Sequence, residues 1–78
     1  MTHRPLATIA RDIRRDWQKV NYAAAPYLEA MQSLDQITDR YIYDSAASVV
    51  RYFLANAAAW RGETAKAIKA ELKLILKG

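Results

Sequence analysis

Residues that break helices are scarce in this chain, because glycine and proline each occur only twice in 78 residues. The few breakers therefore mark helix boundaries. Pro5 and Pro26 suit the first turn of a helix, and Gly62 is the only interior glycine. The chain is long enough for one hydrophobic core and too short for two. The sequence thus predicts an all-α fold: one domain, residues 1–78, forming a compact bundle of three to four amphipathic helices.

Apolar residues recur at spacings of three and four in four segments, which is the period of a helix with one buried stripe. The predicted helices span about 5–19, 26–33, 45–56 and 63–77. Asp44 or Ser45 is the expected N-cap of the third helix, and we expect a break between the third and fourth at Asn56 or Gly62. The stripes predict core positions for Leu6, Ile9, Ala10, Ile13, Trp17, Val20, Leu28, Met31, Leu34, Ala46, Val49, Val50, Phe53, Leu54, Ala57, Ala65, Ile68, Leu72, Ile75 and Leu76.

Residues 35–44 carry no clear helical period. Tyr41, Ile42 and Tyr43 favour strands on propensity, but the interpretation made here is a loop with helical turns. Asp35, Asp39 and Asp44 lack the glycine and terminal glutamate of a calcium-binding loop, so they are read as turn and cap residues.

Four short stretches carry a resemblance to known proteins. Residues 13–17, 26–31, 52–56 and 60–66 read IRRDW, PYLEAM, YFLAN and WRGETAK. In these stretches the chain resembles small accessory proteins encoded by tailed bacteriophages of actinobacteria, a group with no known chemistry attached. The resemblance implies a phage accessory protein made in the host cytoplasm, where some proteins of this kind bind host factors. It assigns no functional residue.

Residues suited to catalysis or metal binding are few. The chain has no cysteine, and its one histidine is His3, close to the N-terminus, where fraying would prevent a fixed ring orientation. We therefore expect no catalytic residue, no cofactor and no metal site. No apolar run approaches the ~18 residues of a membrane span, and no apolar core of a signal peptide is present. The sequence is read as that of a non-enzymatic cytoplasmic protein.

The net charge of +4 is unevenly distributed. Residues 1–20 and 57–78 each contain five basic and two acidic side chains, whereas residues 21–56 contain two basic and four acidic ones. Basic helix faces can bind an anionic partner, or they can simply face water and keep a small protein dissolved. The candidate anionic-partner face comprises Arg4, Arg11, Arg14, Arg15, Lys66, Lys69, Lys73 and Lys77.

Aromatic side chains suggest a competing surface. Trp17, Phe53 and Trp60 lie on or near the apolar stripes and are expected in the core. Exposed tyrosine beside arginine is typical of interface hot spots. The candidate protein interface comprises Tyr27, Arg40, Tyr41 and Tyr43.

Two functions remain open on the sequence. The first is a phage-type accessory protein acting by protein–protein contacts, with a host factor or a second copy as partner. The second copy would form a homodimer, since a core of this size often needs the additional stability that a partner subunit provides. The alternative is a small basic nucleic-acid-binding protein that uses its arginine and lysine helix faces.

Overall fold

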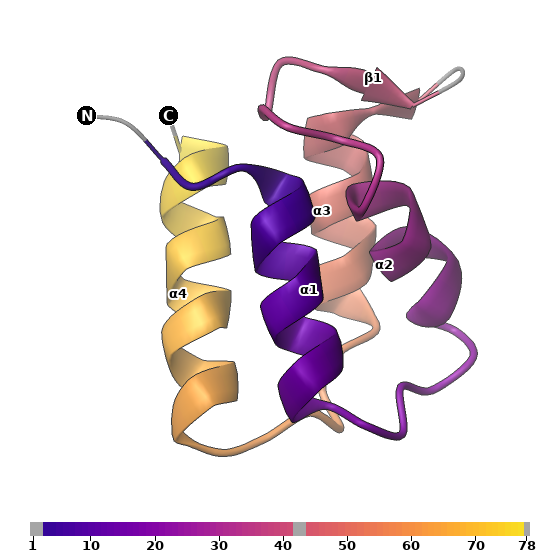
Figure 1. Ribbon diagram of the computed structural model, residues 1–78, viewed down its shortest axis with the longest axis vertical. Helices are drawn as coiled ribbons and strands as arrows, with labels where there is room; N and C mark the ends of the chain where they lie inside the picture. Colours follow the sequence, from indigo (N-terminus) through magenta and orange to yellow (C-terminus); the bar gives the residue numbers. More distant parts are fainter. Residues whose placement is uncertain (1–2, 42–43, 78) are drawn as a thin grey trace.

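The computed structural model describes residues 3–41 and 44–77. Within these ranges the chain forms four helices and one two-stranded hairpin (Figure 1). The helices are α1 (Leu6–Asp16), α2 (Ala25–Met31), α3 (Ala46–Ala55) and α4 (Glu63–Lys77). The hairpin pairs β1 (Arg40–Tyr41) with β2 (Asp44–Ser45) in antiparallel register. The predicted all-α bundle is confirmed.

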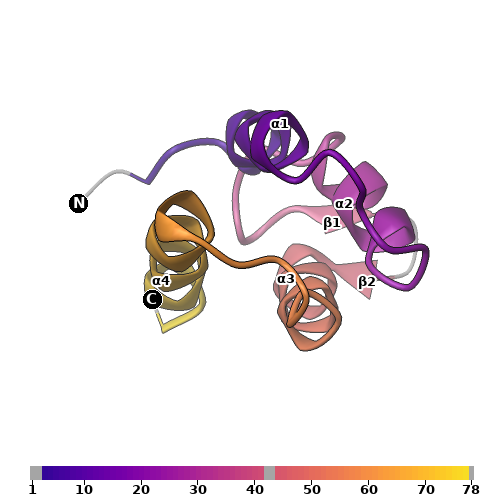
Figure 2. The ribbon, with the colours of Figure 1, turned by 90° about the horizontal axis from the view of Figure 1, so that it is seen from below.

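The helices surround one core, as the view from below shows (Figure 2). Helix α1 packs against α2 and α4, and α3 packs against the same two helices from the other side. The basic segments at the two ends of the chain therefore become neighbours. The buried apolar residues are Leu6, Ile9, Ala10, Ile13, Trp17, Ala24, Leu28, Ala30, Met31, Leu34, Ala46, Val49, Val50, Phe53, Ala57, Trp60, Ala65, Ile68, Leu72 and Ile75.

Helix α1 ends at Asp16, three residues before the predicted end. Trp17 adopts φ −98° and ψ 85°, outside the helical region, although its N–H still bonds the Ile13 carbonyl at 2.7 Å. The indole is nevertheless buried, and Val20 packs against the core at its edge. The apolar period thus identified the right core residues but placed the end of the helix too late. A buried side chain after the last helical turn can continue the same spacing.

Loops supply the hydrogen bonds that the helix starts need. The free N–H groups of Leu6 and Ala7 donate to the carbonyls of Asp35 and Leu34, each at 2.8 Å. The Asn21 carboxamide oxygen accepts from the Ala24 N–H at 2.8 Å, just before α2. Helix α2 begins at Ala25 and ends at Met31, two residues before the predicted end. The bonds from Leu6 and Ala7 hold Leu34 and Asp35, which follow α2, against the start of α1.

The segment before α3 is only partly what the sequence predicted. It contains the expected turn, in which the Asp39 carboxylate accepts from the N–H groups of Asp35 and Gln36 at 2.9 and 3.0 Å. It also contains the β1–β2 hairpin, which the interpretation as a loop with helical turns missed. The strand propensity of Tyr41 indicated a strand here. The strand forms because Arg40 pairs with Ser45 across the hairpin.

The two last helices are bounded by the residues expected to bound them. The Ser45 hydroxyl accepts from the Ser48 N–H at 3.1 Å, so the predicted cap of α3 is confirmed. The connection between α3 and α4 includes Gly62, which has a φ of +115°. Glycine adopts this angle without strain, whereas a residue with a side chain does not. None of the described helices is both long and apolar enough to cross a membrane.

Candidate functional site

The described residues hold no cluster of three or more metal-ligating side chains. The candidate sites are therefore hollows and surfaces. Hollows lie at the N-terminal end of α1, between α1 and α4, and at the α3–α4 connection.

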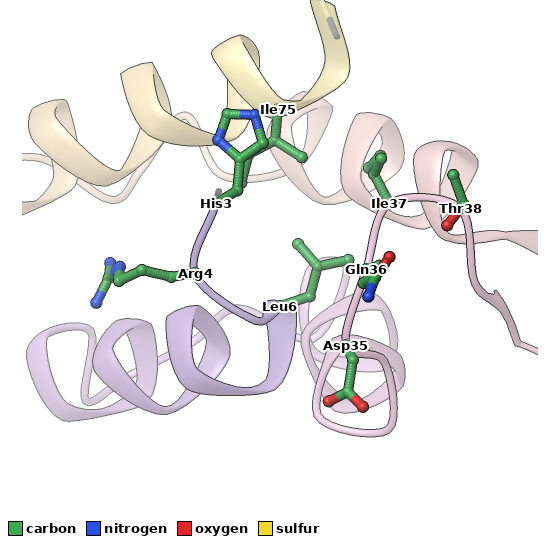
Figure 3. Close-up of a pocket in the computed structure, with 8 residues that line it drawn as sticks. All are labelled: His3, Arg4, Leu6, Asp35, Gln36, Ile37, Thr38 and Ile75. Atoms are coloured by element: carbon green, nitrogen blue, oxygen red, sulfur yellow. The ribbon is translucent and has the colours of Figure 1, made fainter. Parts of the chain in front are cut away.

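The hollow at the start of α1 has a volume of about 270 Å³ (Figure 3). Leu6, Ile37 and Ile75 give it an apolar lining, and His3 lies next to Ile75. The carboxylate of Asp35 points away from the hollow in Figure 3. Arg4 also borders the hollow, but its side chain extends away from Ile37 in Figure 3 and donates to Asp12 and Glu71. A ligand site needs polar groups that converge on one point, so we do not assign one to this hollow.

Arg4 is the centre of an ion-pair network on the surface between α1 and α4. Its guanidinium donates to both carboxylate oxygens of Glu71 at 2.7 and 2.8 Å, and to Asp12 at 2.6 Å. These hydrogen bonds raise the pKa of Arg4 and lower the pKa values of Glu71 and Asp12. The prediction placed Arg4 on a face open to an anionic partner. In the structure its guanidinium instead donates to Glu71 and Asp12 of the same chain.

Acid should weaken this network. A carboxyl group whose pKa is lowered by folding stabilises the protein above its unfolded-state pKa, and that contribution is lost as the pH falls through the folded-state value. We expect Glu71→Gln to lower the free energy of unfolding at pH 7 by about 1 kcal/mol or less, because the pair is partly exposed. The variant should then lose less stability than the natural chain between pH 7 and pH 3. Urea unfolding at both pH values measures this, with the exposed Glu29→Gln as control. Equal acid sensitivity of Glu71→Gln and the natural chain would contradict the assignment.

Lys69 is also engaged within the fold. Its ammonium donates to the Trp60 carbonyl at 2.6 Å and lies 5.8 Å from the centre of the Trp60 ring. Burial lowers the pKa of Lys69, and the positive charges of Lys73 and Arg61 lower it further. The prediction placed Lys69 on an open basic face, whereas the structure makes it an anchor for the α3–α4 connection.

The remaining predicted basic residues fall on two separate surfaces. Lys66, Lys73 and Lys77 are exposed on α4, and we call them the lysine flank. Lys66 lines the hollow beside Trp60, whereas the hollow shared with α1 is lined from α4 by Thr64, Ala67 and Ile68. The lysine flank therefore lies on the side of α4 away from α1. The other surface, which we call the basic ridge, consists of Arg11, Arg14 and Arg15 on α1 together with Lys19 just after it.

All four side chains of the basic ridge are exposed. Among the described residues, the ion pairs present are those of Arg4, so no described carboxylate pairs with the ridge. Lys19 was not part of the predicted face, although the predicted first helix, 5–19, includes it. It is exposed just after the end of α1 and is therefore counted with the ridge.

The predicted tyrosine interface is rearranged. Tyr27 is half-buried on α2 and its ring stacks on that of Tyr52 from α3, with centroids 5.5 Å apart. Arg40 is exposed, but it lies on the hairpin before the start of α3, about two helical turns from Tyr52. The side chain of Tyr41 and the whole of Tyr43 lie outside the described residues.

Tyr22 and Tyr52 are aromatic surface residues that the sequence prediction of an interface did not include. Tyr22 is 91% exposed and Tyr52 is 55% exposed. The Asn21 side chain donates to the Asn56 carbonyl at 3.1 Å, and Asn56 donates to the Tyr52 carbonyl at 2.8 Å. These bonds hold the segment carrying Tyr22 against the end of α3. We call Tyr22, Tyr27 and Tyr52 together the tyrosine surface.

Comparison of the chain with protein-family models, characterised proteins and solved structures gives no match.

Proposed function

We propose that this chain is a non-catalytic protein that binds another protein through its tyrosine surface. The single observation that carries the proposal is the stacked pair of Tyr27 and Tyr52, in which a half-buried ring supports one that is 55% exposed. A ring that is already ordered loses little conformational freedom on binding, so its contact area converts efficiently into affinity. Tyrosine is also enriched in protein interfaces. Its ring packs on apolar groups of a partner while its hydroxyl forms a hydrogen bond.

The distribution of exposed apolar groups supports the same surface. The large hydrophobic side chains exposed in the described ranges are Tyr22, Tyr52 and Leu74, and two of these belong to the tyrosine surface. Such a surface fits a partner that offers an apolar recess for the rings and acceptors for the phenolic hydroxyl groups.

The proposal includes the setting that the sequence resemblance implies. In that setting the chain is an accessory protein of an actinobacterial phage, acts in the host cytoplasm and binds a host factor. The lack of cysteine in the chain fits a reducing compartment. Arg40, Tyr41 and Tyr43 remain predictions for a second contact.

Affinity capture from a nuclease-treated actinobacterial lysate tests the binding function. We expect Tyr52→Ala and Tyr27→Ala each to weaken retention of the partner about 30-fold, the factor that corresponds to a hot spot of about 2 kcal/mol. Lys73→Gln on the lysine flank is the control and should retain the partner fully. Circular dichroism must show that all three variants are helical. Retention that is equal for the tyrosine and lysine variants would refute the tyrosine surface.

A further inference from the structure

We infer that the basic ridge on α1 is a second binding surface, and that its ligand is the phosphate backbone of double-stranded nucleic acid. The proposal is independent of the tyrosine surface, because the three arginines of the ridge belong to α1, whereas the stacked Tyr27 and Tyr52 belong to α2 and α3. The structural basis is three exposed arginines on one face of α1, followed by the exposed Lys19, with no described carboxylate in an ion pair with them.

The acidic residues of α1 make their hydrogen bonds to residues outside the ridge. Asp12 is bonded to Arg4 at 2.6 Å, on the side of α1 that faces α4. Asp16 accepts a hydrogen bond from the Trp60 indole at 2.8 Å, on the same side. Carboxylates spaced three or four residues from an arginine commonly pair with it on a helix. Arg15 lines the same hollow as these two carboxylates, and the charges of Arg15 and Arg11 help to lower the pKa of Asp12. Both carboxylates nevertheless make their hydrogen bonds to Arg4 and Trp60, so within the described residues all the guanidinium donors of the ridge stay open to a partner.

The geometry of the ridge suits a polyanion. Arg11 and Arg15 lie about one helical turn apart, about 6 Å along the axis, and around the helix Arg11 lies between Arg14 and Arg15. Lys19 is exposed in the segment that follows the helix end. Duplex DNA presents one phosphate charge per about 1.7 Å of axis, so three arginines on one helix face can meet several phosphates at once. Arginine is well suited to this contact because its planar donors bind phosphate oxygens in pairs.

Other classes of partner fit the ridge less well. A helix that binds a membrane surface places its apolar face in the lipid, but Leu6, Ile9, Ala10 and Ile13 of α1 are buried in the core. Single-stranded nucleic acid is held by aromatic stacking, whereas α1 contains no aromatic residue and Trp17 just after it is buried against Trp60. The ridge itself offers only charged groups, which contact the backbone and carry no base readout. Binding should therefore be independent of sequence.

Fluorescence anisotropy with a labelled 20-base-pair DNA duplex of arbitrary sequence tests the inference. At 50 mM salt the natural chain should bind with a dissociation constant of about 1–100 μM, and the affinity should fall steeply with added salt. The double substitution Arg11→Gln with Arg15→Gln should weaken binding at least about tenfold and reduce the salt slope by about two. The control is Lys73→Gln with Lys77→Gln on the lysine flank, which removes the same charge and should change the affinity less than about twofold.

Equal losses in the two double variants would show that net charge alone governs binding, and would overturn the ridge as a site. The absence of binding at 50 mM salt would overturn it as well, as would tighter binding to the separated single strand than to the duplex. Because all four substituted side chains are exposed, the helical circular dichroism spectrum should be unchanged in both double variants.

Discussion

Replacing Phe53 by alanine is expected to lower the free energy of unfolding by about 3–5 kcal/mol. Phe53 is fully buried, and its ring meets Trp17 and Trp60 edge to face, with centroids 6.3 and 6.4 Å away. The substitution removes the apolar surface of the ring and leaves a cavity between both indoles. A single core of this size supplies only about 3–5 kcal/mol of net stability, so the variant should be largely unfolded at 25 °C.

Urea unfolding followed by circular dichroism measures this effect. The neighbouring Arg51→Ala is the matched control, because Arg51 is exposed on the same helix and its loss should change the stability by about 0.5 kcal/mol or less. A loss below about 1 kcal/mol for Phe53→Ala would mean that the three aromatic rings do not form the centre of the core.

The second large effect concerns Trp60, which anchors the α3–α4 connection. Its buried ring stacks on Trp17 with centroids 5.8 Å apart and planes inclined by 7°, and its indole N–H donates to Asp16 at 2.8 Å. We expect Trp60→Ala to lower the free energy of unfolding by about 3–5 kcal/mol. Trp60→Phe keeps an aromatic ring and loses the donor, so its cost should be smaller, about 1–2 kcal/mol.

A double-mutant cycle separates the hydrogen bond from the packing. Trp60→Phe is combined with Asp16→Ala, and the free energy of unfolding of all four chains is measured in urea. If the bond contributes, the double variant should be about 1 kcal/mol more stable than the sum of the two single losses implies. Strictly additive losses would show that Asp16 and Trp60 do not interact in solution.

The apolar period of the sequence was sufficient to predict the helices and nearly all of the core. Phe53 and Leu72 are buried where that period placed them. It could not locate the end of α1, because Trp17 continues the period after the backbone has left the helix. It also missed the hairpin, whose strands are two residues each and are fixed by pairing between Arg40 and Ser45, which no local pattern shows.

The candidate surfaces were harder to predict, because side chains far apart in the sequence determine them. Arg4 bonds Glu71, which lies 67 residues later in the chain, and Lys69 bonds the carbonyl of Trp60. Neither side chain therefore belongs to an open basic face. Tyr27 was recognised as an interface residue, but its partner Tyr52 was not, since their stacking depends on how α2 packs on α3. Helix periodicity shows which residues are exposed on one helix and does not show which exposed residues meet.

Site-specific photo-crosslinking tests the central claim, binding of a protein through the tyrosine surface, most directly. A photoreactive amino acid is placed at position 52, and in a second chain at position 74 on the outer side of α4, where Leu74 is 62% exposed. Both chains are irradiated in actinobacterial lysate treated with nuclease. A discrete protein adduct from position 52 that is absent from position 74 is the predicted result. The same adducts from both positions, or none from position 52, would contradict the claim.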